Sequence, residues 1–90
     1  ESNPYARFDA GAAWMSIALQ AQHEGLYAHG MAGIEHAAAA DYLGIDSSLQ
    51  EVVMAFAVGA AVDRNTLTEE QLANETPNTR KPLEALWTAL

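Results

Sequence analysis

The most strongly patterned segment is Phe8–Glu24, in which apolar residues surround almost the whole circumference of a helix. Its alanines favour a helix, Asp9 is placed to cap the start, and Gly25 is placed to end it. One side carries Ala10, Ala13, Trp14, Ile17, Ala18 and Ala21, and another carries Ala12, Met15 and Leu19. A helix that is apolar all round is normally buried on every side. Since 90 residues leave little to surround it, we expect a packing partner.

The middle of the chain alternates between strand and helix patterns. The short apolar segment Leu26–Met31 is predicted to be a strand. Ala32-Gly33 then turns the chain into a helix predicted over Ile34–Leu43, which Gly44 closes. Leu49–Val58 is the clearest second strand, because its nearly continuous apolar run is rich in residues that favour strands and is typical of a strand covered on both faces.

The last third of the chain carries one short helix and a loop. A helix is predicted over Thr68–Glu75, where the four residues from Thr66 to Glu69 have the form of a capping box. A loop rich in turn formers (TPNTRKP) and an apolar tail follow. This order of elements is α/β or α+β. Because two strands do not make a stable sheet alone, we expect the remaining strands to come from elsewhere.

Charge and composition exclude several classes of function. The chain has 4 Lys and Arg against 12 Asp and Glu, a net charge of −8, so it is not expected to bind nucleic acid. Half of the residues are hydrophobic, which argues against disorder. No apolar run approaches the length of a membrane span, so no membrane association is expected.

The absence of cysteine excludes disulfides, thiolate catalysis and cysteine-ligated metals, and it fits a reducing compartment. We therefore expect a soluble, cytoplasmic protein. The chain shows no signal peptide. It begins at Glu1 rather than at methionine, so we expect that upstream sequence has been removed, with an exposed loop just ahead of Glu1 as the cut site.

Catalytic and metal-binding motifs are missing. His23, His29 and His36 do not have the i, i+4 spacing of a helical metal pair, so no metal site is predicted. His29 lies between strand and turn, where a packed or hydrogen-bonded neutral histidine is the favoured interpretation. No nucleophile stands beside a general base, so no catalytic residue is assigned to this chain.

Two short segments have binding chemistry. In HGMAGI, Gly30 and Gly33 leave the backbone uncovered just before a helix, where N–H groups could meet an anion or the edge of a planar cofactor, although a plain tight turn has the same pattern. In PNTRKP, Arg80 and Lys81 follow Asn78 and offer donors suited to a phosphate, although a solvated basic loop would also look like this.

Three blocks in order resemble the second half of a nitroreductase-family flavoprotein: FDAGAAWMSIALQAQHEGLYAHGMAGI, then VVMAFAVG, then ETPNTRKPL. The resemblance covers almost the whole chain, as one partial domain over residues 1–90. It implies an α+β fold, the C-terminal half of an α/β sandwich whose sheet a partner chain must complete. It also implies an intertwined homodimer with FMN in clefts at the interface.

The resemblance also implies roles for particular residues. The backbone of Met31, Ala32 and Gly33 would lie against the isoalloxazine ring, where an N–H donates to flavin N5. Arg80, with Asn78 and Lys81 as lesser candidates, would bind the FMN phosphate. Many relatives carry lysine near the position of Asn78, so this chain has lost a charge there. The tail Leu83–Leu90 would reach across the other subunit.

The arginine-rich segment of the family's first half is absent from this sequence, so we expect the chain not to hold FMN alone. The resemblance then predicts half of an oxidoreductase that transfers hydride by a ping-pong mechanism, from NAD(P)H or an organic donor to a nitroaromatic or quinone-like acceptor. It would need its N-terminal half or a companion subunit. Two alternatives stay open: a non-catalytic small subunit that completes or assembles a flavoprotein, and an acidic helical interaction module without flavin.

Overall fold

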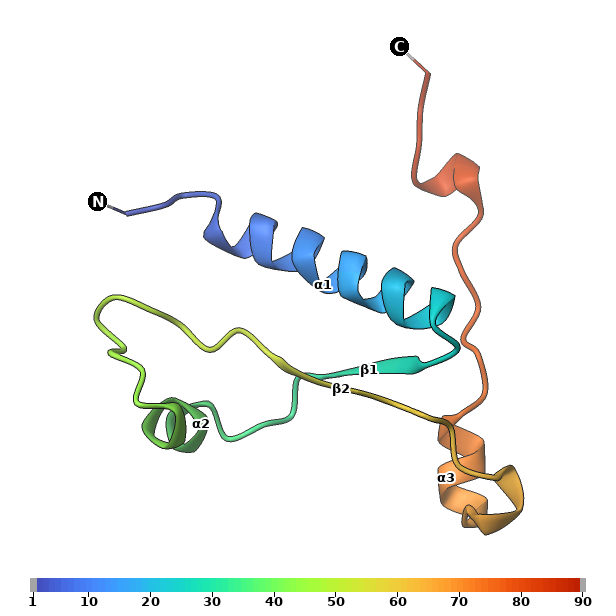
Figure 1. The fold of residues 1–90 in the computed structure, drawn as a ribbon. Helices are drawn as coiled ribbons and strands as arrows, with labels where there is room; N and C mark the ends of the chain where they lie inside the picture. The colour runs from blue at the N-terminus through green and yellow to red at the C-terminus, as the bar shows by residue number, and fades with distance from the viewer. Residues whose placement is uncertain (1, 90) are drawn as a thin grey trace.

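The computed structural model describes residues 2–89, which form helices and one two-stranded antiparallel sheet, a wide hairpin whose strands are joined through a helix (Figure 1). The elements are α1 (Ala6–His23), β1 (Tyr27–Met31), α2 (His36–Leu43), β2 (Ala55–Gly59) and α3 (Glu69–Asn74), with 3₁₀ turns at Arg64–Thr66 and Leu83–Ala85. This mixture confirms the predicted α+β class. Of the predicted C-terminal arm, Leu90 lies outside the described residues.

Helix α1 ends as predicted but begins earlier. Gly25 takes a φ of +73°, and the N–H of Leu26 donates to the carbonyl of Ala21 at 2.8 Å, which satisfies an end carbonyl of the helix. The prediction that Asp9 caps the start was wrong. The helix already begins at Ala6, because the N–H of Tyr5 donates to the side chain of Asn3 at 3.0 Å and turns the chain into the helix.

The hairpin pairs β1 with β2 so that Met31 lies opposite Ala55 and Tyr27 lies opposite Gly59. The prediction that the second strand begins at Leu49 was wrong, since β2 begins at Ala55. Residues 49–54 of the predicted strand come before Ala55, the partner of Met31. No strand within residues 2–89 pairs with them. A strand is assigned by its partner as well as by its sequence, so an apolar run alone misplaces the start.

Both shorter helices begin later than predicted, α2 by two residues and α3 by one. Helix α2 begins at His36 instead of Ile34, because the N–H of Ile34 donates to the carbonyl of Ala32 at 2.9 Å and closes a tight turn first. Helix α3 does have a capping box, but Thr68 forms it with Gln71. The predicted cap, Thr66, instead belongs to the preceding 3₁₀ turn.

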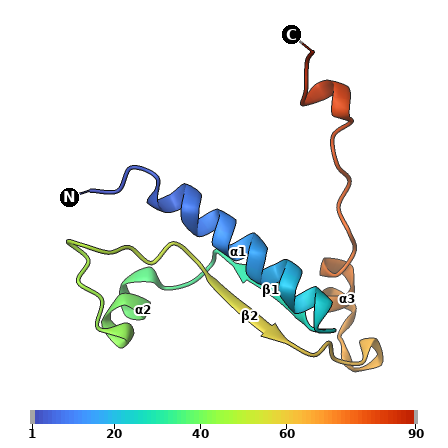
Figure 2. The same ribbon diagram turned by 45° about the horizontal axis from the view of Figure 1, so that its top comes forward.

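Helix α1 packs along the hairpin, as the two views in Figures 1 and 2 show. The rings of Trp14 and Phe56 lie 4.8 Å apart between centroids. Gly30 lies below them: a Cβ built there would meet Trp14 Cζ2 at 3.2 Å and Met54 Cε at 2.7 Å. The absence of a side chain at Gly30 therefore lets the indole reach the strand.

Little of the chain is buried. Within residues 2–89 the only buried apolar side chains are Ala21 and Ala40, whereas Phe8 is 78% exposed and Tyr42 is 90% exposed. The accessible surface is 8292 Å², against about 5,100 Å² for a compact monomer of 9.6 kDa. The radius of gyration is 17.2 Å, where about 12 Å is usual for this length. The apolar surface of α1 needs further protein to cover it.

We predict that Gly30→Ala destabilises the full-length protein by about 1–3 kcal/mol, because the new methyl group would overpack the space below Trp14. The matched control is Gly59→Ala in the same hairpin, where nothing lies within 4 Å of the new Cβ. Thermal unfolding of both variants measures the difference. Equal changes in Tm would contradict this account of the packing.

Candidate functional site

The first predicted group, Met31, Ala32 and Gly33, lies where β1 leaves the hairpin. The carbonyl of Ala32 accepts a hydrogen bond from the N–H of Ile34, which makes the turn tight. The Gly33 N–H forms no hydrogen bond within residues 2–89, and nothing lies within 4 Å of the position of a Cβ at Gly33. All three residues are exposed. The turn therefore presents bare backbone with a free donor, which a flat ring could approach.

The second predicted group, Asn78, Arg80 and Lys81, lies in the exposed segment between α3 and the last 3₁₀ turn. The structure brings two of the three together, because Arg80 Nη1 donates to Asn78 Oδ1. Arg80 keeps further donors for an anion, and Lys81 adds a second positive charge beside it. This arrangement suits a phosphate group.

The two groups do not meet within this chain. Both ribbon views place the segment after α3 near the end of the hairpin where β1 begins, whereas Gly33 follows the other end (Figures 1 and 2). A single ligand that contacts both must be elongated, with a flat part at the turn and an anionic part at Arg80. Flavin mononucleotide, the cofactor that the family resemblance implies, has this form, since a ribityl chain separates its ring from its phosphate, so the separation of the two groups is compatible with it.

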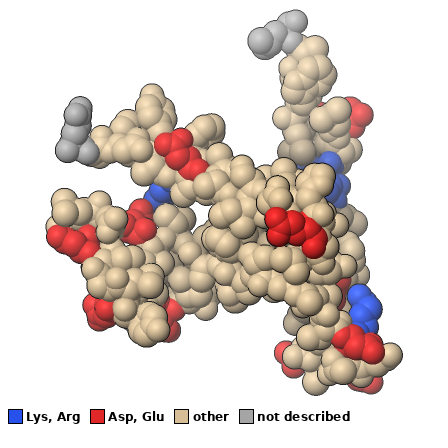
Figure 3. Space-filling view, in the orientation of Figure 1, with Lys and Arg blue, Asp and Glu red and all other residues tan. Residues whose placement is uncertain are grey.

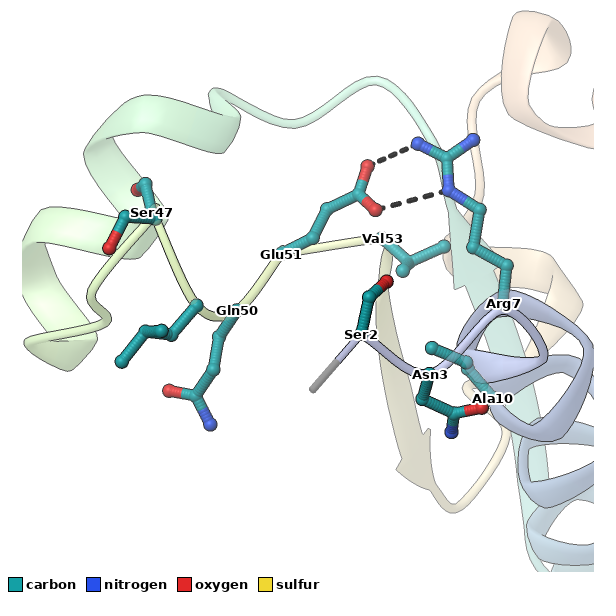
Figure 4. A pocket seen from close by; sticks show the side chains of 11 residues that line it. Ser2, Asn3, Arg7, Ala10, Ser47, Gln50, Glu51 and Val53 are labelled. Atoms are coloured by element: carbon teal, nitrogen blue, oxygen red, sulfur yellow. Dashed lines mark hydrogen bonds and ion pairs between the residues drawn. The ribbon is translucent and has the colours of Figure 1, made fainter.

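An ion pair that the sequence did not reveal joins α1 to the segment ahead of β2. Arg7 Nε donates to Glu51 Oε2 at 3.0 Å, and Arg7 Nη2 donates to the other carboxylate oxygen (Figure 4). The hydrogen bond from Arg7 lowers the pKa of Glu51, and the charges of Arg7 and His36 lower it further. Both residues line an open cavity of about 760 Å³, and none of the predicted site residues lines it.

Two histidines lie near the first group. His29 is exposed in β1 opposite Ala57, so the described residues do not pack around it as expected. His36, the first residue of α2, has its Nε2 3.3 Å from the carbonyl oxygen of Val53. Sequence patterns gave no signal for this contact, because its partners are 17 residues apart.

Charge is unevenly distributed over the face in Figure 3, where acidic side chains form several separate patches and basic side chains only small ones. Arg80 and Lys81 are half of the four basic residues in the chain. Arg7 is already paired with Glu51. Positive charge for an anionic ligand is therefore concentrated at the second group.

No helix within residues 2–89 is long and apolar enough to cross a membrane.

A family model for the nitroreductase family matches residues 1–60. The chain belongs to the nitroreductase family. This confirms the family predicted from the three sequence blocks.

A solved structure supports the same assignment. The chain is similar to an oxidoreductase containing FMN, known from its crystal structure, with 37% identity and a TM-score of 0.82 over 90% of this chain. The match covers 40% of that protein, so this chain spans about two fifths of its length. This confirms the predicted fold, a partial nitroreductase-like domain. Among curated proteins, no match was found.

We predict that Arg7→Gln raises the titration midpoint of Glu51 toward the ordinary glutamate range, because it removes the main cause of the lowered pKa. A carboxyl group whose pKa is lower in the folded than in the unfolded protein stabilises the fold at pH values above its unfolded pKa. This contribution is lost as the pH falls through the folded-state pKa. Carboxyl NMR titration of the full-length protein measures the midpoint. Arg64→Gln is the matched control, and an equal effect from it would contradict the pairing.

Proposed function

We propose that this chain forms part of the FMN site of an oxidoreductase. One observation carries the proposal: nine-tenths of the chain matches an FMN-containing oxidoreductase at 37% identity. Met31, Ala32 and Gly33 contact the isoalloxazine ring, and Arg80, Asn78 and Lys81 bind the phosphate. The exposed turn and the hydrogen-bonded Arg80 and Asn78 support this division of roles. They present a flat backbone surface and a cationic group at separate places.

At the ring, the proposed contribution of this chain is a backbone donor. The Gly33 N–H has no partner within the described residues and would donate to flavin N5, the atom that receives hydride. A backbone donor is set by the fold, so it needs no side-chain rearrangement when the ring binds. The bound flavin supplies the hydride chemistry, and the protein supplies orientation and hydrogen bonds.

At the phosphate, Arg80 is the main ligand. Its planar guanidinium suits two oxygens of a phosphate, and the hydrogen bond with Asn78 restricts its orientation. Lys81 adds charge, but the chain as a whole carries −8, which opposes binding of a dianion. We therefore propose that FMN binding also needs basic residues from the N-terminal half of the same fold or from a companion subunit.

The proposed reaction is hydride transfer from NAD(P)H or an organic donor to a nitroaromatic or quinone-like acceptor, in an intertwined dimer or a higher oligomer. A cytoplasmic location is proposed because the cysteine-free sequence fits a reducing compartment. The exposed apolar surface of α1 supports assembly, since it needs covering. A non-catalytic subunit that only completes or assembles the flavin cleft remains the alternative.

We predict that Arg80→Ala in the assembled protein weakens FMN binding by roughly 10- to 100-fold, the effect of losing a charge-assisted hydrogen bond of about 1.5–3 kcal/mol. Flavin absorbance and a dissociation constant measure the loss, and size-exclusion chromatography checks that assembly persists. Arg64→Ala removes the same charge outside the proposed site and should leave FMN bound. Unchanged flavin content in Arg80→Ala would favour the scaffolding alternative.

We also predict ping-pong kinetics for the assembled protein. Since donor and acceptor react with the same flavin in turn, initial rates at several fixed acceptor concentrations should give parallel double-reciprocal lines. The anaerobic half-reaction is the second measurement, and the donor alone should bleach the flavin. Intersecting lines would contradict a mechanism in which the first product leaves before the acceptor binds.

A further inference from the structure

We propose that His36 is a positioning residue that holds the Gly33 N–H in place by anchoring the far end of the turn at residues 32–35. The inference rests on the FMN site proposed above, since it explains how this chain would keep its donor aimed at the ring. His36 lies at the start of α2 and does not itself belong to the ring-contacting group. It acts through the backbone of the turn.

The turn is attached at both ends to one short stretch of chain. At its near end Met31 pairs with Ala55 in the last step of the β1–β2 ladder. At its far end His36 Nε2 lies 3.3 Å from the carbonyl oxygen of Val53. Because Val53 is only two residues before Ala55, the turn forms a closed loop on residues 53–55.

The chemistry of the far contact is determined by its acceptor. A backbone carbonyl oxygen only accepts hydrogen bonds, so the contact requires a proton on Nε2 of His36, which donates to Val53. The first turn of α2 has no side-chain cap, since its N-cap residue Glu35 forms no such bond. Within the described residues, His36 is thus the side chain that joins the start of α2 to the residues just before β2.

Apart from the hydrogen bond that closes the turn around it, Gly33 is held only by these two anchors within the described residues. It has no side chain to pack, no atom lies within 4 Å of its Cβ position, and its N–H forms no bond within residues 2–89. The one hydrogen bond inside the turn joins the Ile34 N–H to the Ala32 carbonyl at 2.9 Å. The strength of a hydrogen bond falls as its length and angle depart from their usual values, so a turn released at one end would weaken the bond from the Gly33 N–H.

Hydrogen exchange in the flavin-free full-length protein tests the anchor separately from the cofactor. We expect His36→Leu to speed exchange of the Ile34 N–H by about three- to tenfold, the effect of one lost hydrogen bond. His36→Gln keeps an N–H donor of similar reach and should restore slow exchange. His23→Leu, at the end of α1, is the matched control and should change nothing at Ile34.

The flavin midpoint potential tests the role of the anchor toward the ring. A donor to N5 stabilises oxidised flavin, whose N5 has a free lone pair, over reduced flavin, whose N5 carries hydrogen. Releasing the donor should raise the potential by up to about 30 mV, the equivalent of a tenfold change for two electrons. His36→Gln should return the potential to that of the wild type.

The outcomes separate the two proposals. Unchanged exchange in His36→Leu, or equally fast exchange in His36→Gln, would overturn the anchor. Faster exchange with an unchanged potential would overturn the positioning role, and a wild-type protein that binds no FMN would overturn the proposed function instead. If His36→Leu does not fold, His36→Asn replaces it, because its shorter amide falls short of Val53.

Discussion

The packing of Trp14 against the hairpin is the contact on which the rest of this structure depends. The indole rests above Gly30 and beside Phe56, and so fixes α1 relative to both strands. The position of β1 in turn sets where Met31 pairs and where the glycine turn leaves the sheet. A single missing side chain, at Gly30, therefore connects the apolar pattern of the first helix to the geometry of the candidate site.

The sequence predicted those features of the fold that are encoded locally. The left-handed turns at Gly25 and Gly44 end their helices because only glycine adopts that backbone conformation without strain. The start of β2 was misplaced by six residues, because it depends on where β1 ends. The beginning of α2 was misplaced for a similar reason: a turn bond at Ile34 competes with the first helical hydrogen bonds.

Of the candidate site, the sequence indicated two segments, first through their glycines and basic residues and then through a resemblance to a family, and their roles toward FMN stay predictions. How the segments are held was not predictable. Arg7 and Glu51 are separated by 44 residues, and their pairing requires α1 to lie beside the chain that enters β2. Together with the contact between His36 and Val53, this pair braces that stretch from two directions. Long-range contacts of this kind leave no periodicity in a sequence.

The exposed apolar surface of α1 has a consequence for how this chain gains its stability. With so few residues buried, the hydrophobic free energy that normally drives a domain to fold is located at the surface where α1 meets its surroundings. Folding and docking then form one thermodynamic event, governed by mass action when the surroundings are a separate molecule. Exposed residues of α1 such as Met15 and Leu19 would lower the solubility of the undocked chain and stabilise the docked one, so the same side chains govern both properties.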